Sequence, residues 1–155
     1  MQQVIDHLSR ELKALEYELR IELPREIKTA VAMGDLRENA EYHAALERQA
    51  FVKTRVAELR IRLGELSMIN MDQIPRDKVG LGSVVTLLDL DTDTEVVYEL
   101  VVPELSDLSK GLISAASPIG KGIVGRSAGD ELEVAIPSGR KRYEVLEFRT
   151  IHDRE

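Results

Sequence analysis

The chain has 155 residues, of which 43% are hydrophobic, and these values suit one or two globular domains. Because it contains no cysteine, disulfide bonds, thiolate catalysis and thiolate metal sites are excluded. The net charge of −7, with 16 Asp and Glu against 10 Lys and Arg from residue 71 onward, disfavours unaided binding to the phosphates of DNA or RNA.

A repeated apolar pattern predicts a long first helix over about residues 3–33. Its members recur every three or four positions, so they form one stripe along the helix. Pro24 removes a backbone donor within the pattern, but the stripe continues past it, so we expect a bend and not a break. The stripe consists of Leu8, Leu12, Leu15, Leu19, Leu23, Ile27 and Ala30.

A second helix is predicted over about residues 38–68. Two helices joined by a short turn must fold back antiparallel with their stripes in contact. We therefore predict an antiparallel coiled-coil hairpin over residues 1–70, and about 27 residues at roughly 1.5 Å each make it about 40 Å long. The second stripe consists of Ala45, Val52, Val56, Leu59, Leu63 and Leu66.

The turn at the end of this hairpin contains three carboxylates, those of Asp35, Glu38 and Glu41. One interpretation is structural: Gly34 suits the left-handed end of the first helix, and Asp35 with Glu38 fits a capping box that opens the second. The other is functional, because a thin rod is well suited to carrying exposed carboxylates into a narrow place. The two interpretations are compatible, since a cap fixes where a carboxylate points.

Residues 71–79 are polar, contain Pro75 and follow no helical or strand period, which predicts a linker. From residue 80 to 155 the apolar period changes to two, which predicts an antiparallel β-sheet. The sequence thus belongs to the α+β class. The expected strands are residues 83–88, 95–102, 112–115, 131–136 and 142–148.

Two shorter features belong to this second domain. Ser117 and Pro118 are the N-cap and first residue expected of a short helix over residues 117–125, which would pack Ile119 and Ile123 on the sheet. The acidic turn at residues 89–94 has the spacing of a calcium loop. It lacks the glycine and the glutamate that such a loop requires, so we expect a hairpin turn and no calcium.

No apolar run approaches the 18 residues of a membrane span, and the first residues lack the pattern of a secretion signal. We therefore expect a cytoplasmic protein with no membrane contact.

Three stretches resemble the bacterial Gre transcript-cleavage factors, the GreA type more than GreB. The first is the tip, Gly34-Asp35-Leu36-Arg37-Glu38-Asn39-Ala40-Glu41-Tyr42-His43-Ala44-Ala45. The second is Leu8-x-x-Glu11-Leu12 with Leu23-Pro24-x-x-Ile27, and the third is Ser114-Ala115-Ala116-Ser117-Pro118-Ile119-Gly120 followed by Gly129-Asp130. The resemblance covers the whole chain.

This resemblance implies an FKBP-like fold for residues 80–155, with one short helix. It implies that this domain docks at the rim of the secondary channel of bacterial RNA polymerase, through Ser117, Pro118, Ile119 and Gly120. The coil would enter the channel and bring its tip to the 3′ end of backtracked RNA. The polymerase's own metal centre would then cleave that RNA, so the chain would be an accessory factor and not an enzyme.

Asp35 and Glu38 would, by the same resemblance, hold a Mg²⁺ ion shared with the polymerase. Mg²⁺ is typically bound by one or two protein carboxylates and several waters, so two acids can complete a site that a partner half builds. They cannot make one alone. We expect a monomer, because the short turn closes the hairpin within one chain.

Contacts to the RNA are predicted for Arg37, Tyr42 and Arg48, although Tyr42 also fits a place in the helix seam. GreA-type coils often carry basic residues where this chain has Val31 and Leu46. A strong grip on RNA is therefore not expected.

Three other functions compete with cleavage stimulation. A channel regulator that tunes polymerase without promoting cleavage would not require Asp35 and Glu38. A peptidyl-prolyl isomerase is disfavoured because the second domain offers only Tyr98, Tyr143 and Phe148 for an aromatic pocket. A structural coiled coil between chains is disfavoured by the short turn.

Overall fold

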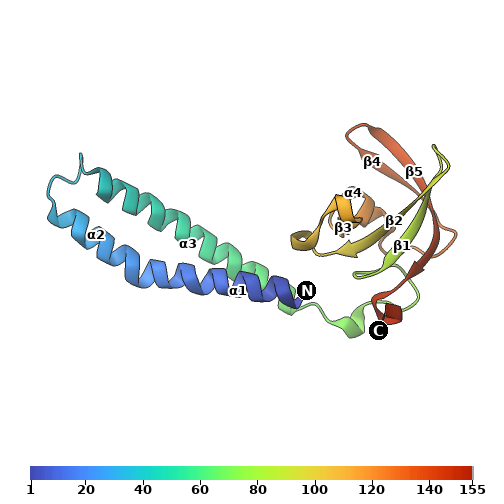
Figure 1. Ribbon diagram of the computed structural model, residues 1–155, viewed down its shortest axis with the longest axis horizontal. Helices are drawn as coiled ribbons and strands as arrows, with labels where there is room; N and C mark the ends of the chain where they lie inside the picture. Colours follow the sequence, from blue (N-terminus) through green and yellow to red (C-terminus); the bar gives the residue numbers. More distant parts are fainter. Residues whose placement is uncertain (155) are drawn as a thin grey trace. The chain divides into compact units, whose positions relative to one another are not determined.

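The structure, a computed structural model, describes residues 1–154 and divides into two compact units, one of residues 1–69 and one beginning at Asn70. In the first unit, α1 (Gln2–Tyr17), a π-helical segment (Glu18–Glu22) and α2 (Leu23–Ala32) form one unbroken helical run. After a loop, α3 (Ala40–Ser67) returns along both α1 and α2 (Figure 1). The predicted antiparallel hairpin is confirmed.

Pro24 is accommodated by the π-helical segment that precedes it. The backbone N–H of Leu23 donates to the carbonyl of Glu18, five residues back, which widens the helix just before the proline ring. The run changes direction between α1 and α2 without interruption, so the expected bend is confirmed (Figure 1). The wider turn also suits the apolar stripe, in which Leu15, Leu19, Leu23 and Ile27 follow one another at spacings of four residues. On a helix of 3.6 residues per turn, three such spacings would rotate the stripe by about 120° around the helix, and a turn with more residues reduces this rotation.

The widened turn keeps Leu23 in the seam. Its side chain is fully buried and packs with Val52 and Val56 of α3, while Leu12, Leu15 and Leu19 pack against this cluster.

Three ion pairs join the two sides of the hairpin, each from an arginine of α3 to a glutamate of the first helical run. Arg55 and Glu11 form a fork, with Nε to Oε1 at 2.8 Å and Nη2 to Oε2 at 3.1 Å. A second fork joins Arg48 to Glu18, at 2.6 and 2.8 Å, and Arg60 contacts Glu16 at 3.3 Å. Such paired geometry fixes the two helices against sliding as well as attracting them.

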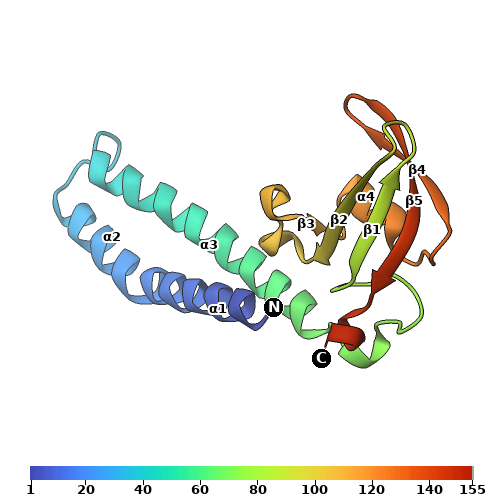
Figure 2. The same cartoon turned by 45° about the vertical axis from the view of Figure 1, so that its right-hand side comes forward.

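The second unit is a curled five-stranded sheet in the order β3-β2-β1-β5-β4 (Figure 2). Its strands are β1 (Val84–Asp89), β2 (Thr94–Val101), β3 (Leu112–Ser114), β4 (Glu131–Ile136) and β5 (Gly139–Arg149). The short helix α4 (Pro118–Ile123) contacts β3 and β4. Single turns of 3₁₀-helix cover Met71–Gln73, Pro103–Leu105, Leu108–Lys110 and Ile151–Arg154.

The prediction of an entirely antiparallel sheet was wrong at one strand. β3 runs parallel to β2, with Leu100 opposite Ile113. The connection between them contains two 3₁₀ turns, after which Leu112 lies opposite Glu99 and β3 runs beside the last three residues of β2. A strand of three residues has too few positions for its direction to be recognised from a period of two.

The core of this unit lies between the sheet and α4. Ile123 is fully buried in it and Ile119 packs at its edge, as predicted. Val79, the last residue of the predicted linker, is also buried here, and its N–H donates to the carbonyl of Arg126. The buried cluster consists of Val79, Val85, Leu87, Leu100, Ile113, Ile123, Leu132, Val134, Tyr143 and Val145.

None of the helices formed by residues 1–154 is long and apolar enough to cross a membrane.

Gly120 should tolerate no side chain. A Cβ there would lie 2.1 Å from the carbonyl oxygen of Ser114 and 3.0 Å from the Cα of Ala115, and backbone atoms cannot move aside cheaply. We expect Gly120→Ala to destabilise the second unit by about 3 kcal/mol or more, measured by denaturant unfolding followed through amide NMR signals of each unit.

Gly64→Ala is the matched control, because a Cβ at this position in α3 meets nothing within 4 Å. It should stabilise the hairpin by about 0.5 to 1 kcal/mol. Equal effects of the two substitutions would contradict the assigned packing of α4.

Acid should weaken the hairpin. The pKa values of Glu11 and Glu18 lie below their ordinary value of 4.5, chiefly because of hydrogen bonds from Arg55 and Arg48. A carboxylate with a lowered pKa stabilises the fold above its unfolded-state value and loses this contribution as the pH falls through its folded-state value. Helix unfolding at about pH 7 and about pH 3 should therefore show a loss of stability in acid.

The double substitution of Arg48→Met and Arg55→Met should reduce this loss. Because these side chains are partly exposed, added salt should reduce it too. If the double variant keeps the full acid sensitivity, the ion pairs are not its cause.

Candidate functional site

The tip of the hairpin is the loop of residues 34–39 between α2 and α3. Met33 ends the first helical run, and Gly34 follows with φ of +90°, so the predicted left-handed glycine is confirmed. Glycine enters this region at no steric cost, which allows the chain to turn immediately after the helix.

The predicted capping box of Asp35 and Glu38 is wrong, because α3 begins at Ala40, two residues later than expected. The N-cap is Asn39, whose Oδ1 accepts the N–H of Tyr42 at 3.0 Å. Asn and Asp are about equal as N-cap residues, but only Asn can also donate. The asparagine three residues before Tyr42 was the signal that the capping-box interpretation missed.

Asn39 also ties the loop to the preceding helix. Its Nδ2 donates to the carbonyl of Ala30 at 2.6 Å and to the carbonyl of Gly34 at 3.3 Å, and the side chain is buried. A second tie, also not foreseen, comes from His43, whose Nε2 donates to the carbonyl of Arg37 at 2.9 Å. Both ties are made to backbone atoms, so the shape of the loop depends on them.

The two predicted catalytic carboxylates lie in this loop and are exposed. Asp35 makes one local contact, accepting the N–H of Arg37 at 3.3 Å. Glu38 forms no hydrogen bond or ion pair within the described residues 1–154. Since Asn39 closes the helix end, neither acid is needed for capping and both are available to a ligand.

A shallow hollow of about 320 Å³ adjoins these acids, and Glu41 also lines it. Across residues 1–154, no three carboxylate, histidine or cysteine groups come together as a metal would require. The two acids of the loop therefore form no three-ligand set with a third group of this kind among these residues.

The three predicted RNA contacts differ in their surroundings. The side chain of Arg37 is exposed beside the acids. Tyr42 is half-buried, and its ring lies 5.8 Å from that of His43. Arg48 is engaged in its fork with Glu18, which raises the pKa of the guanidinium, and lies 5.2 Å from the ring centre of Phe51. An RNA phosphate would have to compete with Glu18 for it.

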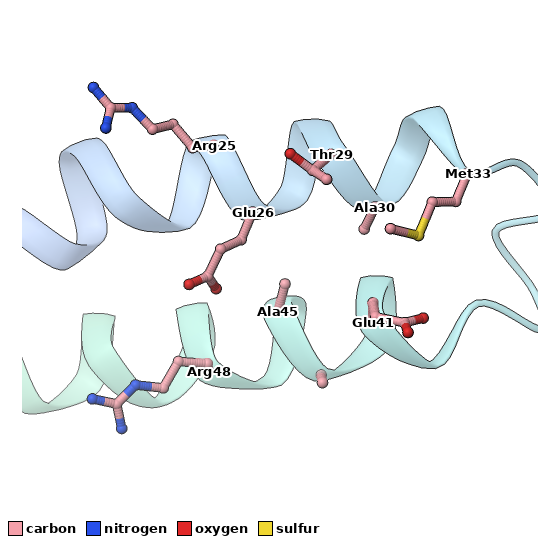
Figure 3. Close-up of a pocket in the computed structure, with 9 residues that line it drawn as sticks. Arg25, Glu26, Thr29, Ala30, Met33, Glu41, Ala45 and Arg48 are labelled. Atoms are coloured by element: carbon pink, nitrogen blue, oxygen red, sulfur yellow. The ribbon is translucent and has the colours of Figure 1, made fainter.

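Behind the tip, the helices leave an open hollow of about 590 Å³ (Figure 3). Ala30 of α2 and Ala45 of α3 extend only methyl groups toward each other across it, while the fully buried Leu23 lies farther from the loop. The two alanines are buried, but their side chains are too small to fill the hollow.

The predicted docking residues open α4 in the second unit. Ser117 caps the helix, accepting the N–H of Gly120 at 3.1 Å, and Pro118 is its exposed first residue. Gly120 is buried, so its part is to permit close packing. Beside them lies an apolar hollow of about 350 Å³, also lined by Leu108, whose side chain is 72% exposed.

Comparison with known proteins finds one family whose models match most of the chain. The model for the N-terminal domain of transcription elongation factors of the GreA and GreB type matches residues 2–67, and the C-terminal model of the same factors matches residues 74–150. The transcription elongation factor GreA of Helicobacter hepaticus is 46% identical over 142 residues, covering 92% of this chain and 87% of that protein. That of Desulfotalea psychrophila is 43% identical over 143 residues, covering 92% and 89%.

Among solved structures, Gfh1 of Thermus aquaticus is 27% identical and aligns over 93% of this chain and 92% of its own, with a TM-score of 0.43.

Removing the charges of Asp35 and Glu38 should leave the fold unchanged, because neither side chain caps α3. We expect the variant with both Asp35→Asn and Glu38→Gln to unfold within about 0.5 kcal/mol of the unmodified chain. Asn39→Ala, measured alongside it by thermal unfolding, should lose about 1 to 2 kcal/mol. A stability loss as large in the carboxylate variant would restore the capping-box interpretation.

Proposed function

Because the chain belongs to the GreA/GreB family of transcription elongation factors, we propose that it stimulates RNA polymerase to cleave backtracked RNA, without being a nuclease itself. The observation that carries the proposal is the tip: two exposed carboxylates in one short loop, neither of which caps α3. A factor that only blocked a channel would need the rod but not these acids.

Asp35 and Glu38 would together hold one Mg²⁺ ion whose remaining ligands come from the polymerase. When bound, such an ion supplies charge stabilisation and an activated water for phosphodiester hydrolysis. The chain's own part is to present two oxygen ligands from a loop whose backbone is tied by Asn39 and His43. The net charge of −7 opposes binding to RNA alone, so a partner must bring the RNA and the tip together.

The thin hairpin suits the route to a buried active site. Its two helices are held by one seam and by the ion pairs of Arg48, Arg55 and Arg60, so no third layer widens it. Docking would fall to the second unit, where the apolar hollow between Leu108 and Pro118 offers a surface for a polymerase segment. Bacterial RNA polymerase and the 3′ end of its backtracked RNA are thus the proposed partners.

Removal of the tip charges should abolish stimulation. In stalled, backtracked polymerase complexes with saturating factor, we expect the variant carrying Asp35→Asn and Glu38→Gln to stimulate cleavage on the order of a hundredfold less, or worse. Its affinity for polymerase should be unchanged, since the docking residues are distant in the sequence. Raised Mg²⁺ or added Mn²⁺ should restore part of the rate, most clearly for the single substitutions.

Glu41→Gln is the matched control, because it removes an equal charge from the first turn of α3 and should leave cleavage largely intact. Factor and RNA with Mg²⁺ but no polymerase should give no cleavage. Unchanged stimulation by the double variant would instead favour a channel regulator that does not promote cleavage.

A further inference from the structure

We propose that Asn39 is a positioning residue for the two tip carboxylates, acting through the backbone of the loop that carries them. This inference rests on the proposed function, because it concerns how Asp35 and Glu38 are presented to the polymerase. It assigns to Asn39 a role beyond that of a helix cap.

The hydrogen bonds of Asn39 admit only one orientation of its amide. Two carbonyl oxygens, those of Ala30 and Gly34, face Nδ2 at 2.6 and 3.3 Å, and the N–H of Tyr42 faces Oδ1 at 3.0 Å. If the amide were flipped, its oxygen would face the two carbonyl oxygens and its NH₂ group would face the N–H of Tyr42, so no hydrogen bond could form. One buried side chain thus uses both of its donor hydrogens and its acceptor.

These bonds hold both ends of the loop. Gly34 is held through its carbonyl and Asn39 is itself the other end, so Asp35 and Glu38 each adjoin a fixed residue. His43 holds the middle of the loop at the carbonyl of Arg37. The six residues are therefore restrained at three points, and the two acids lie between them.

Side-chain packing cannot replace these bonds. The hollow behind the tip separates α2 from α3 where Ala30 and Ala45 face each other, and the fully buried Leu23 lies about two turns away (Figure 3). The bond from Asn39 to the carbonyl of Ala30 is therefore a direct link between the start of α3 and the end of α2.

The substitution Asn39→Ser separates the capping of α3 from the hydrogen bonds that Nδ2 donates to Ala30 and Gly34. Serine is a good N-cap and can still accept the N–H of Tyr42, but its hydroxyl is too short to reach both carbonyls. The carbonyl of Ala30 keeps a bond from the N–H of Met33 at 3.1 Å, so the loss of the tie should leave it paired. Stability should then stay close to that of the unmodified chain.

The test measures stimulated cleavage in backtracked complexes as a function of factor and of Mg²⁺ concentration. For Asn39→Ser we expect the rate at saturating factor to fall about tenfold or more, because a small displacement of reacting groups is costly. The factor concentration for half-maximal rate should not change, and the Mg²⁺ concentration for half-maximal rate should rise. NMR of the free protein should show increased motion of the amides of residues 35–38, with the Tyr42 amide still protected from exchange.

Asn70→Ser is the matched control. Asn70 is also an N-cap, accepting the N–H of Asp72 at 2.9 Å, but it lies outside the hairpin tip and should not affect cleavage. Three results would each overturn the inference. They are a cleavage rate for Asn39→Ser equal to that of the unmodified chain, unchanged motion of the loop amides by NMR, and a rate loss that is explained by weaker binding to polymerase. If Asn39→Ser stimulates fully while the variant of Asp35 and Glu38 does not, only this inference fails. If the unmodified chain gives no stimulation, the proposed function fails with it.

Discussion

A hairpin of two helices has a single seam, and this constraint governs the first unit. Each helix can bury one stripe only, so any drift of that stripe must be corrected within the helix. The π-helical segment before Pro24 does so and keeps Leu23 fully buried against Val52 and Val56. The forks of Arg48 and Arg55 lie beside the same seam and fix its register. A globular core would have offered other surfaces to absorb these irregularities.

The same constraint separates stability from function along the rod. Large apolar residues fill the seam away from the tip, and next to the loop the buried Ala30 and Ala45 adjoin an open hollow. There the backbone is held by polar side chains, chiefly Asn39, whose three hydrogen bonds replace packing. A buried, fully bonded amide can fix geometry that methyl groups cannot, because hydrogen bonds have direction. Neither of the exposed acids Asp35 and Glu38 is therefore needed to cap α3.

Much of this architecture could be predicted from residue patterns. The two apolar stripes gave the hairpin, Gly34 gave the turn, and Ser117 with Pro118 gave α4, because each depends on a local preference. The π segment, the parallel β3 and the role of Asn39 could not be predicted in the same way. Each depends on residues that are separated in the sequence: the π segment on the packing of Leu23 with α3, β3 on its pairing with β2, and Asn39 on the carbonyl of Ala30.

The acids of the tip illustrate how such contacts decide between two interpretations of one motif. Glu41 lies in the first turn of α3, where the helix dipole favours a negative charge, so a structural reason accounts for it. Glu38 and Asp35 precede the N-cap and gain less from the dipole, which falls off within the first turn. An asparagine at position 39 makes the cap without adding a fourth charge, and it supplies the two donors that an aspartate would lack. The identity of one uncharged residue thus makes the two charged ones before it unnecessary for folding, which is the condition for a partner to use them.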